Sequence, residues 1–199
     1  MPTPFKINSI APKKIFSFGF ALALLTQIPT YAQSNSNAGQ LEPVKTIASL
    51  DVSRYLGTWY EIAKFPNWFQ KKCVGNTKAM YSLKDGDGVR VLNSCKTANG
   101  DIAQAEGLAR QIGAADSPKL EVRFAPAWLS FLPFVWGDYW VIDLDSQYEV
   151  AAVSDSKREY LWILSRNPRL DQKKYDDLVG RLQGQGFDTR NLEITNQSQ

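Results

Sequence analysis

This 199-residue chain is poor in histidine and cysteine, the residue types that most often serve as catalytic bases, nucleophiles and metal ligands. There is no histidine, and the only cysteines are Cys73 and Cys95. Because histidine is the commonest general base and metal ligand, its absence excludes Ser/His and Cys/His nucleophilic sites and the usual zinc sites. A free cysteine could act as a nucleophile and a buried Asp143 as an acid, but no second catalytic group stands at a recognisable spacing from them. The sequence therefore predicts no catalytic residue, no metal site and no cofactor.

The charge distribution argues against nucleic-acid binding. The chain has 23 Lys and Arg against 20 Asp and Glu, a net charge of +3. Lys6, Lys13 and Lys14 all precede residue 33, where there is no acidic residue, so the rest of the chain is neutral. Because nucleic-acid binding depends largely on neutralising phosphates, we expect no nucleic-acid partner.

Residues 1–32 have the order of a secretory signal peptide. Lys13 and Lys14 precede an apolar run over residues 15–25, and Ala32 marks the expected cleavage position. A membrane anchor is the alternative, but crossing the hydrocarbon takes about 20 apolar residues. The run has 11.

The region after the leader is expected to form one domain. Residues 33–45 are predicted to be a flexible lead-in and residues 46–199 a single folded unit. A bacterial lipoprotein signal needs a cysteine directly after the apolar run, and the first cysteine is Cys73. We therefore expect an unanchored protein of the periplasm or the secreted fraction.

The expected export to an oxidising compartment determines the expected state of the two cysteines. An oxidising compartment favours a disulfide between Cys73 and Cys95, which closes a loop of about 20 residues and contributes roughly 3 kcal/mol in the chain-entropy model. Simple hairpin register places Cys95 opposite a residue near position 78, so the chain around Cys73 has to bend back to meet it. Two free thiols are the alternative.

Eight short segments with β-type alternation or composition follow one another at roughly 10-residue spacing. They span residues 57–64, 77–84, 89–96, 102–111, 119–124, 138–145, 148–153 and 159–165. Two Asp-Gly pairs over residues 85–88 predict a tight hairpin between the second and third segments. This succession is typical of an antiparallel sandwich or barrel.

One amphipathic helix is expected after the strands. Tyr175, Leu178, Val179 and Leu182 recur with the spacing of one helix face. Residues 192–195 could add a short edge strand. The order of elements predicts an all-β fold, an eight-stranded antiparallel up-and-down β-barrel with a C-terminal α-helix packed on its wall, because closure removes unpaired sheet edges.

Such a barrel can be apolar inside, in water, or apolar outside, in an outer membrane. Over residues 120–124 the apolar side chains share one face and the two charges the other, which fits both. We favour an apolar interior because the amphipathic helix needs an outer wall on which to dock in water. Eight strands enclose space for one small ligand.

Three segments carry motifs in a fixed order. Residues 55–63 (YLGTWYEIA) contain Gly-x-Trp, residues 137–145 read GDYWVIDLD, and residues 160–168 (YLWILSRNP) contain an arginine after a strand. This set, within residues 50–195, resembles the lipocalin family and, within it, the bacterial lipocalin and apolipoprotein D branch. The resemblance implies that Gly57, Trp59 and Arg166 have structural roles, with Trp59 at the closed end of the barrel and Arg166 across it.

The resemblance also implies a ligand cavity. Glu61, Tyr81, Asn93 and Trp162 match positions that line it, and Phe124 joins them if its strand turns its apolar face inward. An apolar pocket with a few polar groups suits a ligand with a tail and a polar head, such as a fatty acid or a lysophospholipid. The alternative for Glu61 is a carboxylate at the rim, in water.

Two aromatic loops are expected to share one end of the barrel. They span residues 65–69 (FPNWF) and 125–136 (APAWLSFLPFVW). An exposed apolar rim marks a partner or membrane surface, so we expect transient membrane contact there. The alternative is that the longer loop closes the mouth as a lid or lines the cavity. The predicted rim residues are Trp68, Phe69, Trp128, Phe131 and Phe134.

These observations together indicate an exported, non-enzymatic carrier of a small hydrophobic or amphipathic lipid, acting as a monomer or weak dimer. One alternative is a lipocalin-type enzyme, an isomerase or de-epoxidase, acting on a lipid or carotenoid. Another is a pigment or tetrapyrrole binder, which without histidine needs a different iron ligand.

Overall fold

The computed structural model describes residues 42–84 and 88–198. The predicted signal peptide and most of the predicted hairpin turn lie outside these residues. The barrel strands are β1 (Gly57–Lys64), β2 (Cys73–Leu83), β3 (Val89–Thr97), β4 (Ile102–Gln111), β5 (Lys119–Arg123), β6 (Gly137–Leu144), β7 (Val150–Ser154) and β8 (Leu161–Ser165). The remaining elements are α1 (Val52–Tyr55), η1 (Ala127–Leu129), η2 (Pro133–Val135), α2 (Gln172–Gly184), η3 (Thr189–Asn191) and β9 (Glu193–Ile194).

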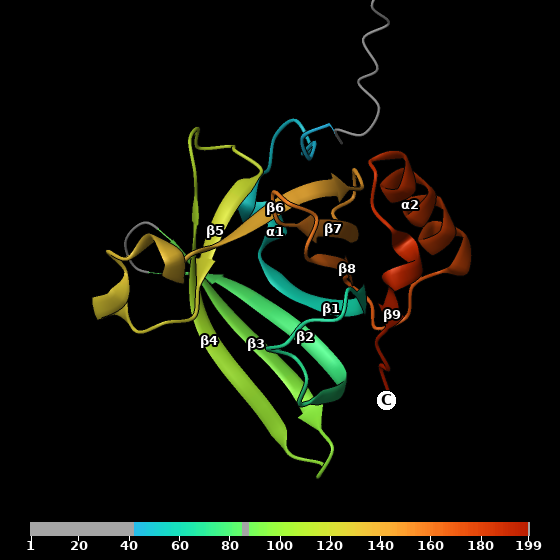
Figure 1. Cartoon of the computed structure of the whole chain (residues 1–199), viewed down its shortest axis with the longest axis horizontal. Coiled ribbons are helices and arrows are strands. Elements are labelled where there is room, and N and C mark those ends of the chain that lie inside the picture. Colours follow the sequence, from blue (N-terminus) through green and yellow to red (C-terminus); the bar gives the residue numbers. More distant parts are fainter. Residues whose placement is uncertain (1–41, 85–87, 199) are drawn as a thin grey trace, which may run out of the picture. The chain divides into compact units, whose positions relative to one another are not determined.

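The sheet closes on itself. Each strand from β2 to β8 pairs antiparallel with the next, and β1 pairs with both β8 and β2 (Figure 1). The predicted up-and-down barrel of eight strands is therefore confirmed. The short β9 extends the sheet beyond β1, with Ile194 opposite Ala63, where an edge strand was expected.

The first barrel strand begins at a glycine for a local reason. Gly57 has a φ of +96°, and a Cβ placed on it would lie 3.1 Å from Nη1 of Arg166. A side chain at this position is disfavoured both by the left-handed backbone and by the guanidinium beside it. The Gly-x-Trp motif thus lets Arg166 approach the strand closely.

Alternation along β8 divides the apolar residues between two cores. Leu161 and Ile163 face outward and pack with Leu178 and Leu182 of α2, and all four side chains are fully buried. Trp162 and Leu164 face the barrel interior, where they join the cluster that includes Trp59. The helix is therefore packed on the wall as predicted, and Figure 1 shows it beside β7 and β8.

Two ion pairs between neighbouring strands lie on the outer face of the sheet. Arg90 of β3 pairs with Glu106 of β4 at 2.7 Å, and Arg110 of β4 pairs with Glu121 of β5 at 2.8 Å. Leu120, beside Glu121, is 5% exposed and belongs to the interior cluster. The barrel is therefore apolar inside. Among the described residues no helix is long and apolar enough to cross a membrane.

Candidate ligand cavity

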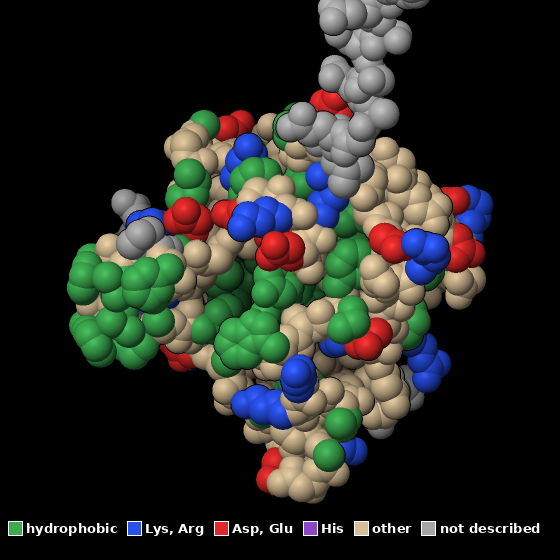
Figure 2. Space-filling view, viewed as in Figure 1, with side chains coloured by type: hydrophobic (Ala, Val, Ile, Leu, Met, Phe, Trp, Pro, Cys, Tyr) green, Lys and Arg blue, Asp and Glu red, His purple; other side chains and the backbone are tan. Residues whose placement is uncertain are grey.

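The barrel encloses a cavity of about 840 Å³. Its wall is mainly apolar, with Val89 and Val91 from β3, Leu120 and Val122 from β5, and Leu164 from β8. In Figure 2 hydrophobic side chains line a hollow in the surface. Cavities of about 300–1,000 Å³ bury most of the surface of a small organic ligand, so this one can hold such a molecule.

The closed end of the cavity is sealed by an arginine and a tryptophan. Trp59 is fully buried, and the Arg166 guanidinium carbon lies 4.1 Å from the centre of its ring. Arg166 also donates hydrogen bonds to the backbone carbonyls of Arg54, Thr58 and Tyr148. This is the geometry that the resemblance implies, and it ties α1 and the β6–β7 loop to the start of β1.

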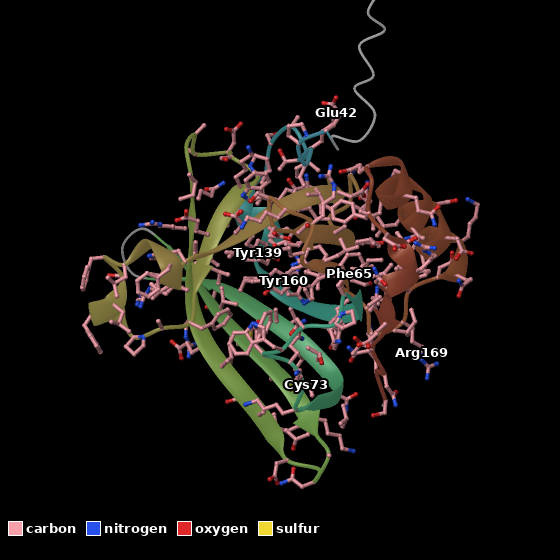
Figure 3. The ribbon with its side chains drawn as sticks, viewed as in Figure 1. Glu42, Phe65, Cys73, Tyr139, Tyr160 and Arg169 are labelled. Carbon is pink, nitrogen blue, oxygen red and sulfur yellow. A yellow bond between two sulfur atoms is a disulfide. The ribbon has the colours of Figure 1, made fainter. Side chains whose placement is uncertain are left out.

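Three tyrosines form the floor of the cavity above this seal. Tyr55 comes from α1, Tyr81 from β2 and Tyr139 from β6. Figure 3 labels Tyr139 among the side chains of the barrel. The hydroxyl oxygen of Tyr139 lies 3.0 Å from that of Tyr55 and 2.8 Å from that of Tyr81. Burial raises the pKa of Tyr81 to about 12 and raises the pKa values of the other two well above the ordinary phenol range. All three phenols are therefore neutral at physiological pH.

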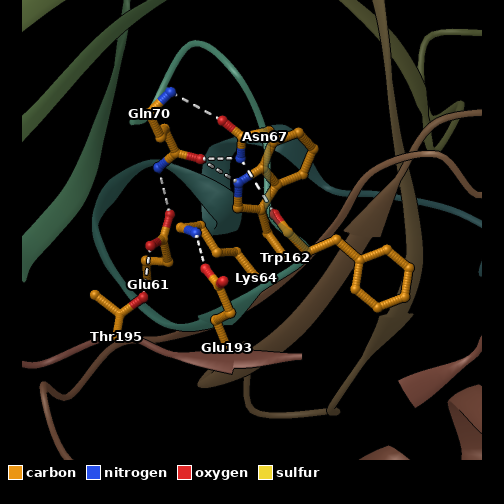
Figure 4. A network of polar contacts seen from close by, with 8 residues as sticks. Glu61, Lys64, Asn67, Gln70, Trp162, Glu193 and Thr195 are labelled. Carbon is orange, nitrogen blue, oxygen red and sulfur yellow. Dashed lines mark hydrogen bonds and ion pairs between the residues drawn. The ribbon is translucent and has the colours of Figure 1, made fainter. Parts of the chain in front are cut away.

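Glu61 is the buried carboxylate of the cavity wall. It is 3% exposed and accepts hydrogen bonds from Gln70 at 2.7 Å and from Thr195 at 2.6 Å (Figure 4). Burial raises the pKa of Glu61 above its usual value, and the two hydrogen bonds oppose that rise. The alternative of a solvated carboxylate at the rim is therefore wrong.

Gln70 links this carboxylate to the mouth of the cavity. Its side-chain oxygen accepts hydrogen bonds from Asn67 at 2.6 Å and from the indole of Trp162 at 3.1 Å. Trp162 stacks on Tyr160, with ring centres 5.8 Å apart. The side-chain amide of Gln70 thus links Asn67 of the first loop, the carboxylate of Glu61 and the indole of Trp162 by hydrogen bonds.

The five predicted ligand residues, including Tyr81 of the floor, all line the cavity at different depths. Glu61, Asn93 and Trp162 lie along the wall, while Phe124 is 44% exposed and lies at the edge. The resemblance predicted this location for Glu61, Tyr81, Asn93 and Trp162, and an inward-facing apolar side of its strand predicted it for Phe124. Gln70, Tyr55, Tyr139 and Thr195 were missed. The sequence offered only one signal for them, since Tyr55 and Tyr139 stand inside two of the three motifs.

The predicted rim residues are exposed beside the mouth. Trp68 is 72%, Trp128 73%, Phe131 75% and Phe134 79% exposed. Trp68, Phe69 and Phe134 also line the cavity. In Figure 2 a hydrophobic patch lies where Figure 1 draws the segment between β5 and β6. Phe134 and Val135 of this segment line the cavity, as one of the alternatives expected, while Trp128 and Phe131 are exposed to solvent.

The segment between β5 and β6 is held against the outer wall of the barrel. The Trp136 ring lies 4.0 Å from the Arg110 guanidinium carbon and 5.2 Å from that of Arg123. The Trp136 indole donates to the carbonyl of Ser130 at 2.9 Å. These contacts fix the base of the segment while its outer aromatic side chains face solvent.

The groups considered for catalysis are engaged elsewhere. Cys73 and Cys95 form the expected disulfide, with Cα atoms 5.5 Å apart, so neither is a free nucleophile. Pairing of Lys78 with Ser94 agrees with the expected register, and two bulges in β2 bring Cys73 back toward β3. The idea of Asp143 as a catalytic acid is not supported, because it pairs with Arg181 of α2 at 2.7 Å on the outer wall. Among the described residues no cluster of metal-ligating side chains occurs.

Comparison with known proteins agrees with this geometry. A family model described as a lipocalin-like domain matches residues 50–197. The chain belongs to the lipocalin family. Temperature-induced lipocalin-1 of Arabidopsis thaliana is 39% identical to this lipocalin over 157 residues, which cover 78% of this chain and 83% of the relative.

Two further relatives support the expected branch. The outer membrane lipoprotein Blc of Escherichia coli K12 is 38% identical, with 73% of this lipocalin and 78% of the relative covered. Apolipoprotein D of Macaca fascicularis is 34% identical, with 75% and 78% covered. This lipocalin is therefore similar to both the bacterial and the apolipoprotein D proteins.

Proposed function

We propose that this lipocalin is an exported carrier that binds a fatty acid, a lysophospholipid or a related lipid in its barrel. The observation that carries the proposal is the apolar cavity of about 840 Å³, closed by Trp59 and Arg166 and open at the other end. Each Å² of apolar tail taken out of water contributes about 25 cal/mol, so burial of a hydrocarbon tail drives binding. The disulfide between Cys73 and Cys95 supports a location outside the cytoplasm.

Charged groups suited to a lipid head lie at the open end. Lys72 precedes β2 and Lys157 lies in the β7–β8 loop, and both exposed side chains belong to residues that line the cavity. An ammonium group here can pair with a carboxylate or phosphate that stays in water. The charged head therefore remains at the mouth while the tail occupies the barrel.

Purification under native conditions, followed by mass spectrometry of the extracted lipid, tests the carrier function directly. We expect a fatty acid or lysophospholipid at up to one molecule per chain, together with a mature chain that begins after Ala32. A protein that carries no lipid and also fails to bind added fatty acid and lysophospholipid contradicts the proposal.

We further propose that the lipid is exchanged with a membrane through the aromatic rim. The exposed Trp128, Phe131 and Phe134 support this, because tryptophan is enriched at the boundary between lipid and water and phenylalanine is among the apolar residues that membrane-surface segments bury there. These aromatic side chains also lie beside the opening through which a lipid tail leaves the cavity. If the opening contacts the bilayer, the tail passes from the cavity into the membrane without being exposed to water.

Cosedimentation with vesicles of phosphatidylcholine and phosphatidylglycerol tests the exchange step. We expect the wild type to sediment with the vesicles and the triple variant Trp128→Ser, Phe131→Ser, Phe134→Ser to stay in the supernatant. Leu83→Ser is the control, since Leu83 is 69% exposed and lies at the end of β2 next to the hairpin turn. Equal sedimentation of wild type and triple variant contradicts the membrane contact.

A further inference from the structure

The floor of the cavity presents more hydrogen-bond donors than the protein uses. Tyr55, Tyr81 and Tyr139 have one hydroxyl hydrogen each, which gives three donors. The two contacts among their oxygens, at 3.0 Å and 2.8 Å, use two of these hydrogens whichever oxygen donates. No other hydrogen-bond partner of these hydroxyls occurs among residues 42–84 and 88–198. One donor is therefore left over in every arrangement.

The three hydroxyls lie in apolar surroundings, where an unmatched hydrogen-bond donor is energetically costly. All three tyrosines line the cavity, and their neighbours in the interior cluster include Val91, Leu120 and Val141. When a lipid tail fills the barrel and expels water, an unmatched hydroxyl in such surroundings is unfavourable. An oxygen atom on the buried end of the ligand removes that penalty.

A charged group does not suit this position. Arg166, the cation whose charge acts on Tyr55 and Tyr81, lies over the face of Trp59 and already donates to three backbone carbonyls. Neutral phenols can donate to a carbonyl or hydroxyl oxygen, but they do not compensate the burial of a full charge. A carboxylate or phosphate head is therefore excluded from the floor and stays at the mouth.

We propose that Tyr55, Tyr81 and Tyr139 form a subsite for an uncharged oxygen, and that this lipocalin selects lipids with a hydroxyl or carbonyl at the end of the tail remote from the charged head. The inference rests on the proposed carrier function and adds a substrate class to it. Oxygenated acyl chains fit this description, whereas a plain hydrocarbon tail leaves the third donor unmatched.

The test compares saturated fatty acids from lauric to stearic acid with their ω-hydroxy derivatives of equal length. Each acid displaces a fluorescent fatty-acid probe from the wild type and from the triple variant Tyr55→Phe, Tyr81→Phe, Tyr139→Phe. Removing all three hydroxyls together leaves no phenol unpaired and keeps the volume of the floor nearly unchanged. Tyr160→Phe is the control, because Tyr160 lines the same cavity near its mouth.

For the chain length that reaches the floor, we expect the preference for the hydroxy acid over the plain acid to fall about tenfold in the triple variant. It should be unchanged in the Tyr160→Phe control. An equal preference in wild type and triple variant at every chain length overturns the subsite but leaves the carrier function standing. Failure of every acid to displace the probe from the wild type overturns both.

A measurement on the wild type alone keeps the proposal testable if the triple variant does not fold. A fatty acid with a ketone next to its terminal methyl group reports hydrogen bonding through its carbonyl stretching frequency. We expect the bound ketone to absorb at lower frequency than the same molecule in a hydrocarbon solvent. An unshifted band for every bound chain length overturns the subsite.

Discussion

Replacing Arg166 with alanine should lower the stability of the fold without weakening lipid binding. The substitution removes a guanidinium that lies 4.1 Å from the centre of the Trp59 ring, an interaction worth about 1 kcal/mol. It also removes hydrogen bonds to the carbonyls of Arg54, Thr58 and Tyr148, at 2.8, 3.0 and 3.2 Å. Water replaces part of these hydrogen bonds at this partly exposed site, which leaves about 0.5–1 kcal/mol for each. The free energy of unfolding should fall by about 3 kcal/mol and Tm by about 6–12 °C.

Urea unfolding followed by tryptophan fluorescence measures this loss, and displacement of a fluorescent fatty acid measures binding. Arg169→Ala is the matched control, because Arg169 follows closely in the chain and its side chain points into solvent (Figure 3). We expect Arg166→Ala to bind lipid normally below its unfolding transition, since Arg166 does not line the cavity. A loss below about 1 kcal/mol, or a selective loss of lipid binding with stability intact, refutes the structural role.

Three further predictions concern the disulfide and the cavity wall. Cys73 and Cys95 enclose a separation of 22 residues, so the double serine variant should lose about 3 kcal/mol of unfolding free energy; thiol titration of unreduced, denatured protein should find no free thiol. Burial raises the folded-state pKa of Glu61 above the ordinary 4.5, so its contribution to stability is greatest when it is protonated and declines as pH rises through the folded pKa. In urea unfolding from pH 4 to pH 7 the stability of Glu61→Gln relative to wild type should therefore increase, and a constant difference contradicts this account. Trp162→Ala should weaken displacement of the fluorescent fatty acid by more than about tenfold through lost apolar contact; unchanged affinity would place the ligand elsewhere.

Local signals in the sequence were enough to predict most of the barrel. The structure has strands at Gly57–Lys64 and Ile102–Gln111, as expected, because alternation and turn residues are properties of neighbouring positions. The second strand was predicted to begin at residue 77, yet β2 begins at Cys73. Two bulges and the disulfide extend it, and both depend on contacts with β3 that no local pattern records.

The sequence predicted several residues that line the cavity, but it did not predict which side chains form hydrogen bonds with them. The resemblance pointed to Glu61 and Trp162, but the amide that joins them belongs to Gln70, in a loop whose course depends on the whole barrel. In the same way Tyr81 was expected to line the cavity, while its contact with Tyr139 requires β2 and β6 to face each other across the interior. Hydrogen bonds across a closed sheet depend on register and curvature together, which one strand alone does not determine.

The two ends of the barrel differ in a way that sets the direction of ligand binding. At the closed end Arg166 donates to backbone carbonyls and Trp59 is fully buried, so opening this end would break several interactions at once. At the other end Trp68 and Phe134 are more than 70% exposed while lining the cavity, so a tail can pass them without breaking a polar contact. On the proposed carrier function, a lipid enters tail first through the mouth, and the leading atoms of its tail meet the tyrosine floor. In this orientation the tyrosine floor contacts the end of the tail and discriminates between lipid tails, whereas the residues at the mouth contact the charged head and discriminate between lipid heads.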